Sequence, residues 1–300
     1  MQIARSKIEQ LRDYIEQPQR VVILSHTNPD GDAIGSSLAW AEVLKRHGHE
    51  VTCILPNKFP YYLDFMPGCG DMVIYKSDSE GRAAAAVRSA DLIFCLDFPS
   101  LHRLDAPLSE LIASNTTARR ILIDHHLDPP QEFDIMFSYP DASSTSYLVY
   151  KVIEALWGAQ SVTAKQAEVL YVGMMTDTGN FSFSHLTPDL YMSLAVLCAT
   201  GINIPQIYNN VYNSFTEGRA RLFGYTINRK MKTLRKGTVA YMSLTEAEMR
   251  RFWFQQGDNE GFVNYPLTIK KMRMSAIFTE HTDFIRVSLR SRGNVDVNLF

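Results

Sequence analysis

The sequence lacks the features that mark secreted, membrane-spanning and disordered chains. It has only four cysteines in 300 residues, and none forms a CxxC pair, so we expect neither a disulfide framework nor a cysteine zinc site. No apolar run approaches the length that spans a bilayer, and the first residues hold no signal-peptide core. Repeats and low-complexity segments are also absent. These absences predict a globular protein with reduced thiols in the cytoplasm.

The composition is that of a globular protein, with 46% hydrophobic and 21% charged residues in a chain long enough for two domains. The net charge of −2 conceals an asymmetry, because residues 1–214 carry a net charge of −9 and residues 215–300 carry +7. An acidic part can hold cations and a basic part can hold an anion. The split therefore indicates a phosphate-bearing substrate, with a chance distribution of surface charge as the alternative.

Short apolar runs of strand type alternate with helical patterns through the first two thirds of the chain. This alternation predicts an α/β fold in which a parallel sheet carries helices on both faces. Strands are expected at 21–24, 51–55, 72–75, 92–96 and 121–123, and helices at 3–16, 33–47, 81–89, 145–157, 163–175 and 189–199.

The pattern of predicted secondary structure changes after residue 215. Residues 232–242 predict a hairpin with a turn at Lys236-Gly237, and residues 274–279 and 284–290 predict a second pair of strands. This part is expected to form a smaller α+β domain. The predicted division is a catalytic domain at 1–186, a helical linker at 187–215 and a substrate-binding domain at 216–300.

The first predicted strand ends in a turn with one imidazole and two carboxylates. His26, Asp30 and Asp32 lie between the strand at 21–24 and the helix that follows. Two carboxylates in one turn repel each other unless a positive group lies between them. A divalent metal is the simplest such group, because hard cations accept carboxylate oxygen and imidazole nitrogen. The alternative is a loop with an N-capping aspartate and a solvated histidine.

Acidic and histidine residues also follow two further strands. Asp97 follows the strand at 92–96, and Asp124, His125 and His126 follow the strand at 121–123. Because the carboxyl ends of parallel strands meet at one edge of a sheet, we expect these residues to converge with the first turn. Several such clusters at the same topological position are harder to explain as independent caps than as one site.

In their order and spacing these residues resemble the four motifs of the DHH phosphoesterase superfamily, in its oligoribonuclease (nano-RNase) and adenosine bisphosphate phosphatase branch. The matching residues are His26-x-x-x-Asp30-x-Asp32, Asp97, the triplet Asp124-His125-His126, and Asp177. The basic C-terminal part is similar to a DHHA1 domain. The resemblance implies an α/β catalytic domain joined to a smaller substrate-binding domain.

The resemblance also implies a pair of Mn²⁺ ions, with Mg²⁺ or another divalent ion as the alternative. Two such ions can lower the pKa of a shared water and stabilise charge during displacement at phosphorus. The implied ligands are His26 and Asp30 for one ion, Asp32 and His125 for the other, Asp97 as a bridge, and Asp177 as a further ligand.

Further roles follow from the same resemblance. Asp124 would orient the histidines, and His126 would face the scissile phosphate as a contact or proton donor. Arg290 and Ser291 resemble the Arg-Ser segment that holds the non-scissile phosphate in DHHA1 domains. For the neighbouring Arg292 the alternative is a solvated basic hairpin end. DHHA1 domains usually continue into a Gly-Gly-Gly-His segment, and the sequence stops at Phe300 before one, so we expect a truncated or incomplete substrate domain.

The expected activity is Mn²⁺-dependent hydrolysis of short RNA oligonucleotides, including linear dinucleotides, and of adenosine 3′,5′-bisphosphate. The alternatives are a single-strand-specific exonuclease, an inorganic pyrophosphatase-like hydrolase and, outside the enzymes, a nucleotide-binding sensor. A sensor is disfavoured because every expected ligand is present. Partners are expected to be short RNA or nucleotide phosphates, with no membrane partner, and a homodimer remains open.

Overall fold

The computed structural model describes residues 1–182, 185–293, 295 and 297. The chain divides into two compact units. Unit 1 comprises Met1–Phe59 and Leu63–Val211, and unit 2 comprises Pro60–Tyr62 and Tyr212–Phe300. Three residues of an N-terminal loop therefore belong with the C-terminal part of the chain, which the sequence does not suggest. The end of the chain at 298–300 lies outside the described residues.

Unit 1 is built on a six-stranded parallel sheet in the order β3-β2-β1-β4-β5-β6. The order reverses between β1 and β4, and such a reversal opens a crevice outside the carboxyl ends of the strands. The predicted parallel α/β fold is confirmed, with one additional edge strand, β6. The strands are β1 (Arg20–Leu24), β2 (Glu50–Leu55), β3 (Val73–Ile74), β4 (Leu92–Leu96), β5 (Arg119–Asp124) and β6 (Ile135–Ser138).

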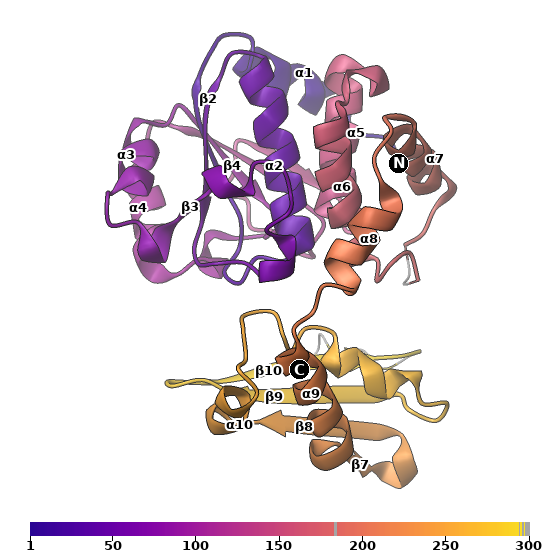
Figure 1. Ribbon diagram of the computed structural model, residues 1–300. Helices are drawn as coiled ribbons and strands as arrows, with labels where there is room; N and C mark the ends of the chain where they lie inside the picture. The colour runs from indigo at the N-terminus through magenta and orange to yellow at the C-terminus, as the bar shows by residue number, and fades with distance from the viewer. Residues whose placement is uncertain (183–184, 294, 296, 298–300) are drawn as a thin grey trace. The chain divides into compact units, whose positions relative to one another are not determined.

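Helices cover both faces of this sheet, as predicted (Figure 1). On one face Val22 of the sheet shares a hydrophobic core with Val87 of α3 and Ile112 of α4. On the other face α2, α5 and α6 pack together, and Trp40 of α2 meets the ring of Phe94 edge-on, with the centroids 5.3 Å apart. The helices are α1 (Arg5–Tyr14), α2 (Gly31–Arg46), α3 (Arg82–Ser89), α4 (Ala106–Ser114), α5 (Thr145–Trp157), α6 (Ala164–Asp177), α7 (Pro188–Ala199) and α8 (Ile204–Tyr212).

The three helices on that second face begin with side-chain caps. Asp30 caps α2 by accepting hydrogen bonds from the backbone N–H groups of Asp32 and Ala33. Ser144 caps α5, and Thr163 caps α6 in a reciprocal capping box. Each cap satisfies backbone donors that a helix start leaves unpaired. The caps therefore fix where each helix starts, and those of α2 and α5 also fix the first-turn residues at the carboxyl edge of the sheet.

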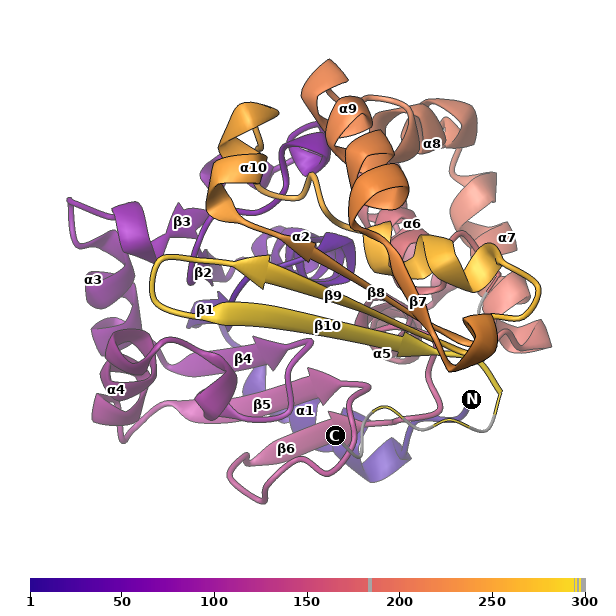
Figure 2. The same cartoon turned by 90° about the horizontal axis from the view of Figure 1, so that it is seen from below.

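Unit 2 contains a four-stranded sheet in the order β10-β9-β8-β7, with α9 and α10 on one face (Figure 2). Leu222, Met249 and Phe262 pack against Met242 and Ile277 of the sheet in a separate core. Both predicted antiparallel pairs are present, and β8 and β9 join them in parallel. The elements are α9 (Glu217–Tyr225), β7 (Lys232–Leu234), β8 (Val239–Leu244), α10 (Glu246–Arg251), β9 (Met274–Glu280) and β10 (Ile285–Ser291).

Within the described ranges, no single helix is both long and apolar enough to cross a bilayer. The pair α7 and α8, bent by 107°, meets the length and composition requirement only when the two are taken together.

The four cysteines are all free thiols. Cys53 and Cys95 are buried, as their apolar runs predict, whereas Cys69 and Cys198 are only half-buried. Burial raises the pKa of the Cys53 thiol to about 12, which keeps it protonated and unreactive at neutral pH.

Candidate metal centre

The predicted ligands converge at the carboxyl edge of the sheet in unit 1. They come from the ends of β1, β4 and β5 and from the last turn of α6. Three overlapping groups have ligand atoms that all lie within 4.8 Å of one another: His26, Asp30 and Asp97; Asp32, His125 and Asp177; and Asp97, His125 and His126.

Asp97 belongs to the first group and also lies close to His125 of the second. Its Oδ2 is 3.4 Å from Nε2 of His26, and its Oδ1 is 3.6 Å from Nε2 of His125. Nε2 of His125 is also 3.5 Å from Oδ2 of Asp177. Asp97 directly follows β4 and has a φ of 66°, in the left-handed region that non-glycine residues seldom adopt. The two oxygens of this carboxylate therefore face different sets of donors, which is the arrangement a bridging ligand requires.

The first turn of α5 holds two carboxylates of the cluster. The backbone N–H groups of Thr145 and Ser146 donate to the two oxygens of Asp32, at 2.7 and 2.8 Å. The hydroxyl of Thr145 donates to Oδ1 of Asp97 at 2.9 Å. A helix N-terminus stabilises negative charge, so α5 positions both carboxylates. The sequence predicts a helix start at this position but gives no sign of the contacts that Thr145 makes with the two carboxylates.

Asp124 and His126 form a pair beside the cluster. Nδ1 of His126 lies 2.7 Å from Oδ1 of the fully buried Asp124, with Nδ1–H as the donor. The His126 side chain is 36% exposed, so the ring is accessible while its inner nitrogen is fixed. A carboxylate on Nδ1 sets the tautomer and leaves Nε2 for chemistry.

The cluster brings several carboxylates close together, and this shifts the pKa values within it. Burial, together with Asp32 and Asp30, holds the pKa of Asp97 well above its ordinary value. Burial alone would lower the pKa of His125, but Asp97, Asp32 and Asp177 raise it to about 9. The carboxylates thus raise one another's pKa and that of His125, and a divalent cation would offset this concentrated negative charge. Two imidazoles and four carboxylates form a donor set suited to a transition-metal dication.

Helix α6 approaches the cluster through Gly173. A Cβ atom at this position would lie 1.9 Å from Oγ of Ser146 and 2.9 Å from Oδ1 of Asp32. Gly173→Ala is therefore expected to push α6 away from α5 and to displace Asp32. We expect a cost of about 1–3 kcal/mol in unfolding free energy and a loss of about tenfold or more in divalent-metal affinity. Denaturant unfolding and calorimetric Mn²⁺ titration measure these two effects.

Gly224→Ala is the matched control for this substitution. Gly224 lies within α9, and a Cβ atom there would meet nothing within 4 Å, so alanine should be neutral or slightly stabilising. Wild-type Mn²⁺ affinity in Gly173→Ala would mean that the packing of α6 does not position the cluster.

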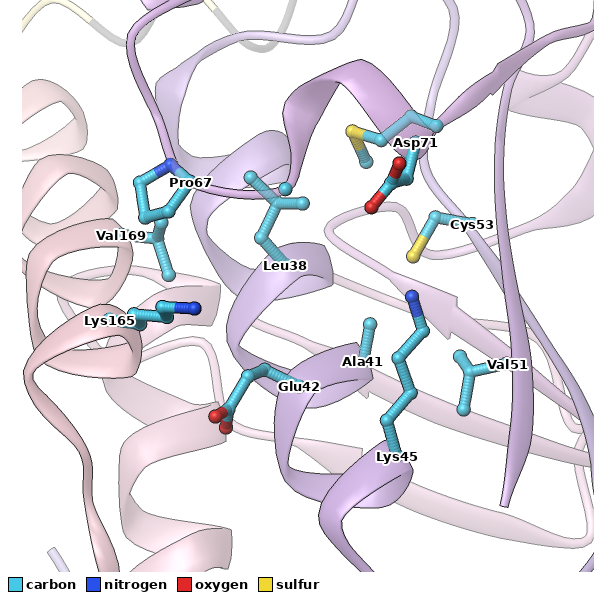
Figure 3. Close-up of a pocket in the computed structure, with 12 residues that line it drawn as sticks. Leu38, Ala41, Glu42, Lys45, Val51, Cys53, Pro67, Asp71, Lys165 and Val169 are labelled. Atoms are coloured by element: carbon cyan, nitrogen blue, oxygen red, sulfur yellow. The ribbon is translucent and has the colours of Figure 1, made fainter. Parts of the chain in front are cut away.

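A cavity of about 290 Å³ lies elsewhere on unit 1, between α2, β2 and α6 (Figure 3). Its walls carry Glu42, Lys45, Asp71 and Lys165, and the Lys45 ammonium group points toward Cys53 (Figure 3). None of the residues of the metal cluster lines this cavity. It is therefore separate from the candidate metal centre.

Arg290 and Ser291 lie at the end of β10 in unit 2. Arg290 is exposed, and its Nη1 donates to the carbonyl of Leu289 at 2.8 Å. The hydroxyl of Ser291 donates to the carbonyl of Val295 at 2.5 Å. Their role as a phosphate clamp stays a prediction.

Residues 20–174, more than half of the chain, match the DHH family, N-terminal domain. The parallel α/β sheet and its histidine–aspartate cluster, taken with this match, define a metal-dependent hydrolase. The chain belongs to the DHH family, and the resemblance drawn from its motifs is confirmed.

Relatives extend the match beyond the first domain. The chain is 26% identical over 278 residues to the bifunctional oligoribonuclease and PAP phosphatase NrnA of Thermus thermophilus, covering 92% of this chain and 77% of that protein. It is 39% identical to an exopolyphosphatase-related protein from Bacteroides fragilis, whose crystal structure superimposes with a TM-score of 0.92 over 99% of this chain and 86% of that one. RecJ of Thermus thermophilus, solved with Mn²⁺, shares the fold at 11% identity and a TM-score of 0.51, over 97% of this chain and 47% of that one.

Proposed function

We propose that the protein is a Mn²⁺-dependent phosphoesterase that hydrolyses very short RNA oligonucleotides, linear dinucleotides included, and removes the 3′-phosphate of adenosine 3′,5′-bisphosphate. The observation that carries this proposal is the position of Asp97 between two sets of metal donors. It is supported by similarity to a protein named as an oligoribonuclease and PAP phosphatase over 92% of the chain.

The residues of the cluster would hold two divalent ions. When bound, the ions would lower the pKa of a water molecule and offset charge on the phosphate oxygens. Imidazole ligands favour Mn²⁺ over Mg²⁺, which prefers an all-oxygen shell. The proposed ligands are His26, Asp30 and Asp97 for one ion, and Asp32, His125 and Asp177, with Asp97 shared, for the other.

The remaining chemistry falls to side chains that hold a proton or a phosphate. His126, fixed through Nδ1 by Asp124, would present its other nitrogen to the scissile phosphate and, as the imidazolium, donate the proton on Nε2 to the leaving oxygen, which leaves the neutral ring with its Nδ1–H on Asp124. Thr145 would keep Asp32 and Asp97 in place, so that little reorganisation precedes the reaction.

In unit 2, Arg290 and Ser291 would bind a second, non-scissile phosphate of the substrate. A guanidinium group can donate two parallel hydrogen bonds to phosphate oxygens. The net charge of +7 over residues 215–300 supports an anionic ligand for this part of the chain.

The test is release of mononucleotides from a 5′-labelled RNA dinucleotide in the presence of Mn²⁺. Adenosine 3′,5′-bisphosphate, inorganic pyrophosphate and a long single-stranded DNA are assayed beside it. We expect turnover of the dinucleotide and the bisphosphate only. Preferred hydrolysis of pyrophosphate, or processive degradation of the DNA, would replace the proposal with one of those activities. Binding of Mn²⁺ and nucleotide without turnover of any substrate would indicate a sensor.

A further inference from the structure

The loop after β2 contacts the turn that carries the first metal motif, His26–Asp32, here called the metal turn. Oδ1 of Asn57 accepts a hydrogen bond from the backbone N–H of Asn28 at 2.7 Å, and Nδ2 of Asn57 donates to Oδ1 of Asn28 at 3.1 Å. Asn28 lies in the middle of the metal turn and has a φ of 59°. The two bonds hold one residue of left-handed conformation between His26 and Asp30. Asn57 therefore fixes the backbone from which the proposed ligands project.

The loop that carries Asn57 continues into unit 2, which begins three residues later at Pro60. The hydroxyl of Tyr61 donates to Oδ1 of Asp258 at 3.1 Å and accepts from the backbone N–H of Thr216 at 3.3 Å. Asp258 is fully buried, and its Oδ2 accepts from the backbone N–H of Gln255 at 2.7 Å. Since a buried carboxylate is costly to leave unpaired, these bonds favour a single position of the Tyr61 side chain in unit 2.

The residues on either side of Tyr61 also make contacts in unit 2, and the segment Pro60–Tyr62 is here called the anchor. The hydroxyl of Tyr62 hydrogen-bonds to Glu260, and its ring meets Phe215 at a right angle, with the centroids 5.7 Å apart. At Gly257, with a φ of 98°, a Cβ atom would lie 2.6 Å from Cβ of Pro60. Hydrogen bonds, an aromatic contact and the close approach of Pro60 to Gly257 thus hold Pro60–Tyr62 in unit 2.

We propose that Asn57 is a positioning residue for the metal turn. We further propose that the hydrogen bonds of Tyr61 in unit 2 control how firmly Asn57 holds this turn. Two residues separate Asn57 from the anchored segment, and the span to Pro60 is at most about 10 Å when fully extended. One of the two, Phe59, belongs to unit 1 and is buried, so the segment that links Asn57 to Pro60 is short and partly held in place. Loosening the anchor in unit 2 therefore relaxes Asn57 and, through it, Asn28.

The consequence is that the metal affinity of unit 1 responds to a change made only in unit 2. This inference rests on the proposed metal site but does not depend on which phosphoester is hydrolysed. It is tested on the full chain by calorimetric titration with Mn²⁺ alone and by amide hydrogen exchange at Asn28. That amide donates directly to Asn57, so its exchange rate reports local opening of the bond.

Asn57→Ala is expected to weaken Mn²⁺ binding about tenfold and to accelerate exchange at Asn28. Tyr61→Phe keeps the ring and removes only the hydrogen bonds of the hydroxyl group. It should weaken Mn²⁺ binding about threefold and also accelerate exchange at Asn28. Because both substitutions act along one connection, the double variant should bind Mn²⁺ no more weakly than Asn57→Ala alone.

Tyr225→Phe is the matched control, since it also removes a hydroxyl bond in unit 2, here to Glu248 at 2.6 Å, without involving Pro60–Tyr62. It should leave both readouts unchanged. If Tyr61→Phe behaves like this control, or if the losses multiply in the double variant, the coupling is overturned.

The role of Asn57 has a separate control. Asn57→Asp keeps the oxygen that accepts from Asn28 and should retain part of the protection, which keeps the test open if the alanine variant does not fold. Unchanged Mn²⁺ affinity in the folded Asn57 variants would overturn the positioning role. Neither readout uses turnover, so failure to cleave RNA would count against the proposed function alone.

Discussion

Asp97→Asn is expected to lower kcat/KM by about 10³-fold or more, because it removes the carboxylate that faces both sets of metal donors. An asparagine keeps one oxygen, which can still accept from Thr145, but it loses the charge and the second oxygen. A loss of about 4 kcal/mol in transition-state stabilisation corresponds to this factor. Initial rates at saturating Mn²⁺, with a parallel Mn²⁺ titration, measure the effect. Asp13→Asn, at an exposed position of α1, is the control and should retain full activity.

The same substitution should stabilise the metal-free protein. Burial and the neighbouring carboxylates raise the pKa of Asp97, so this group contributes its full stability below the unfolded value of 3.8 and loses it as pH rises through the folded pKa. His125, raised from 6.5 to about 9, acts in the same direction between those two values. The metal-free wild type should therefore lose stability from pH 6 to pH 9.

In Asp97→Asn this loss should be smaller, because the variant lacks the buried carboxylate whose pKa is raised and which also raises the pKa of His125. Thermal unfolding with a chelator at pH 6 and pH 8.5 measures the difference. Added Mn²⁺ should reverse the ranking, because it stabilises only a protein that binds it. If the variant is less stable than wild type at pH 8.5 in chelator, repulsion between these carboxylates does not destabilise the metal-free protein.

The fold and the cluster could be predicted from sequence because each depends on a short pattern and one topological rule. The runs before Asp97 and Asp124 are apolar and brief, and parallel strands bring their carboxyl ends to one edge. The contacts of Thr145 with two carboxylates depend on how α5 is turned against α2, which no local pattern encodes. The anchor between Tyr61 and Asp258 joins residues 197 positions apart. Its two side chains carry no motif, so only the structure shows that they meet.

His126→Ala is expected to retain Mn²⁺ binding and to lower kcat on the RNA dinucleotide by about 10²–10⁴-fold, the range of a lost general acid. The ring lies beside the cluster, its inner nitrogen is bonded to Asp124, and it is accessible to a substrate. Asp124→Asn should produce a smaller loss of the same kind, since the ring remains but its tautomer is no longer fixed. His281→Ala, a histidine of unit 2 stacked on Phe284, is the control and should leave kcat unchanged.

Two roles for His126, proton donor and phosphate contact, predict different responses to the leaving group. A phosphoester whose leaving oxygen needs no proton, such as a nitrophenyl ester of a nucleotide, should be hydrolysed almost normally by His126→Ala if the histidine donates a proton. It should be hydrolysed as poorly as the dinucleotide if the histidine binds the phosphate in the transition state. We expect the first result, because a ring that a buried carboxylate holds through Nδ1 presents Nε2 in a fixed direction, as proton transfer requires, whereas a simple phosphate contact does not need this.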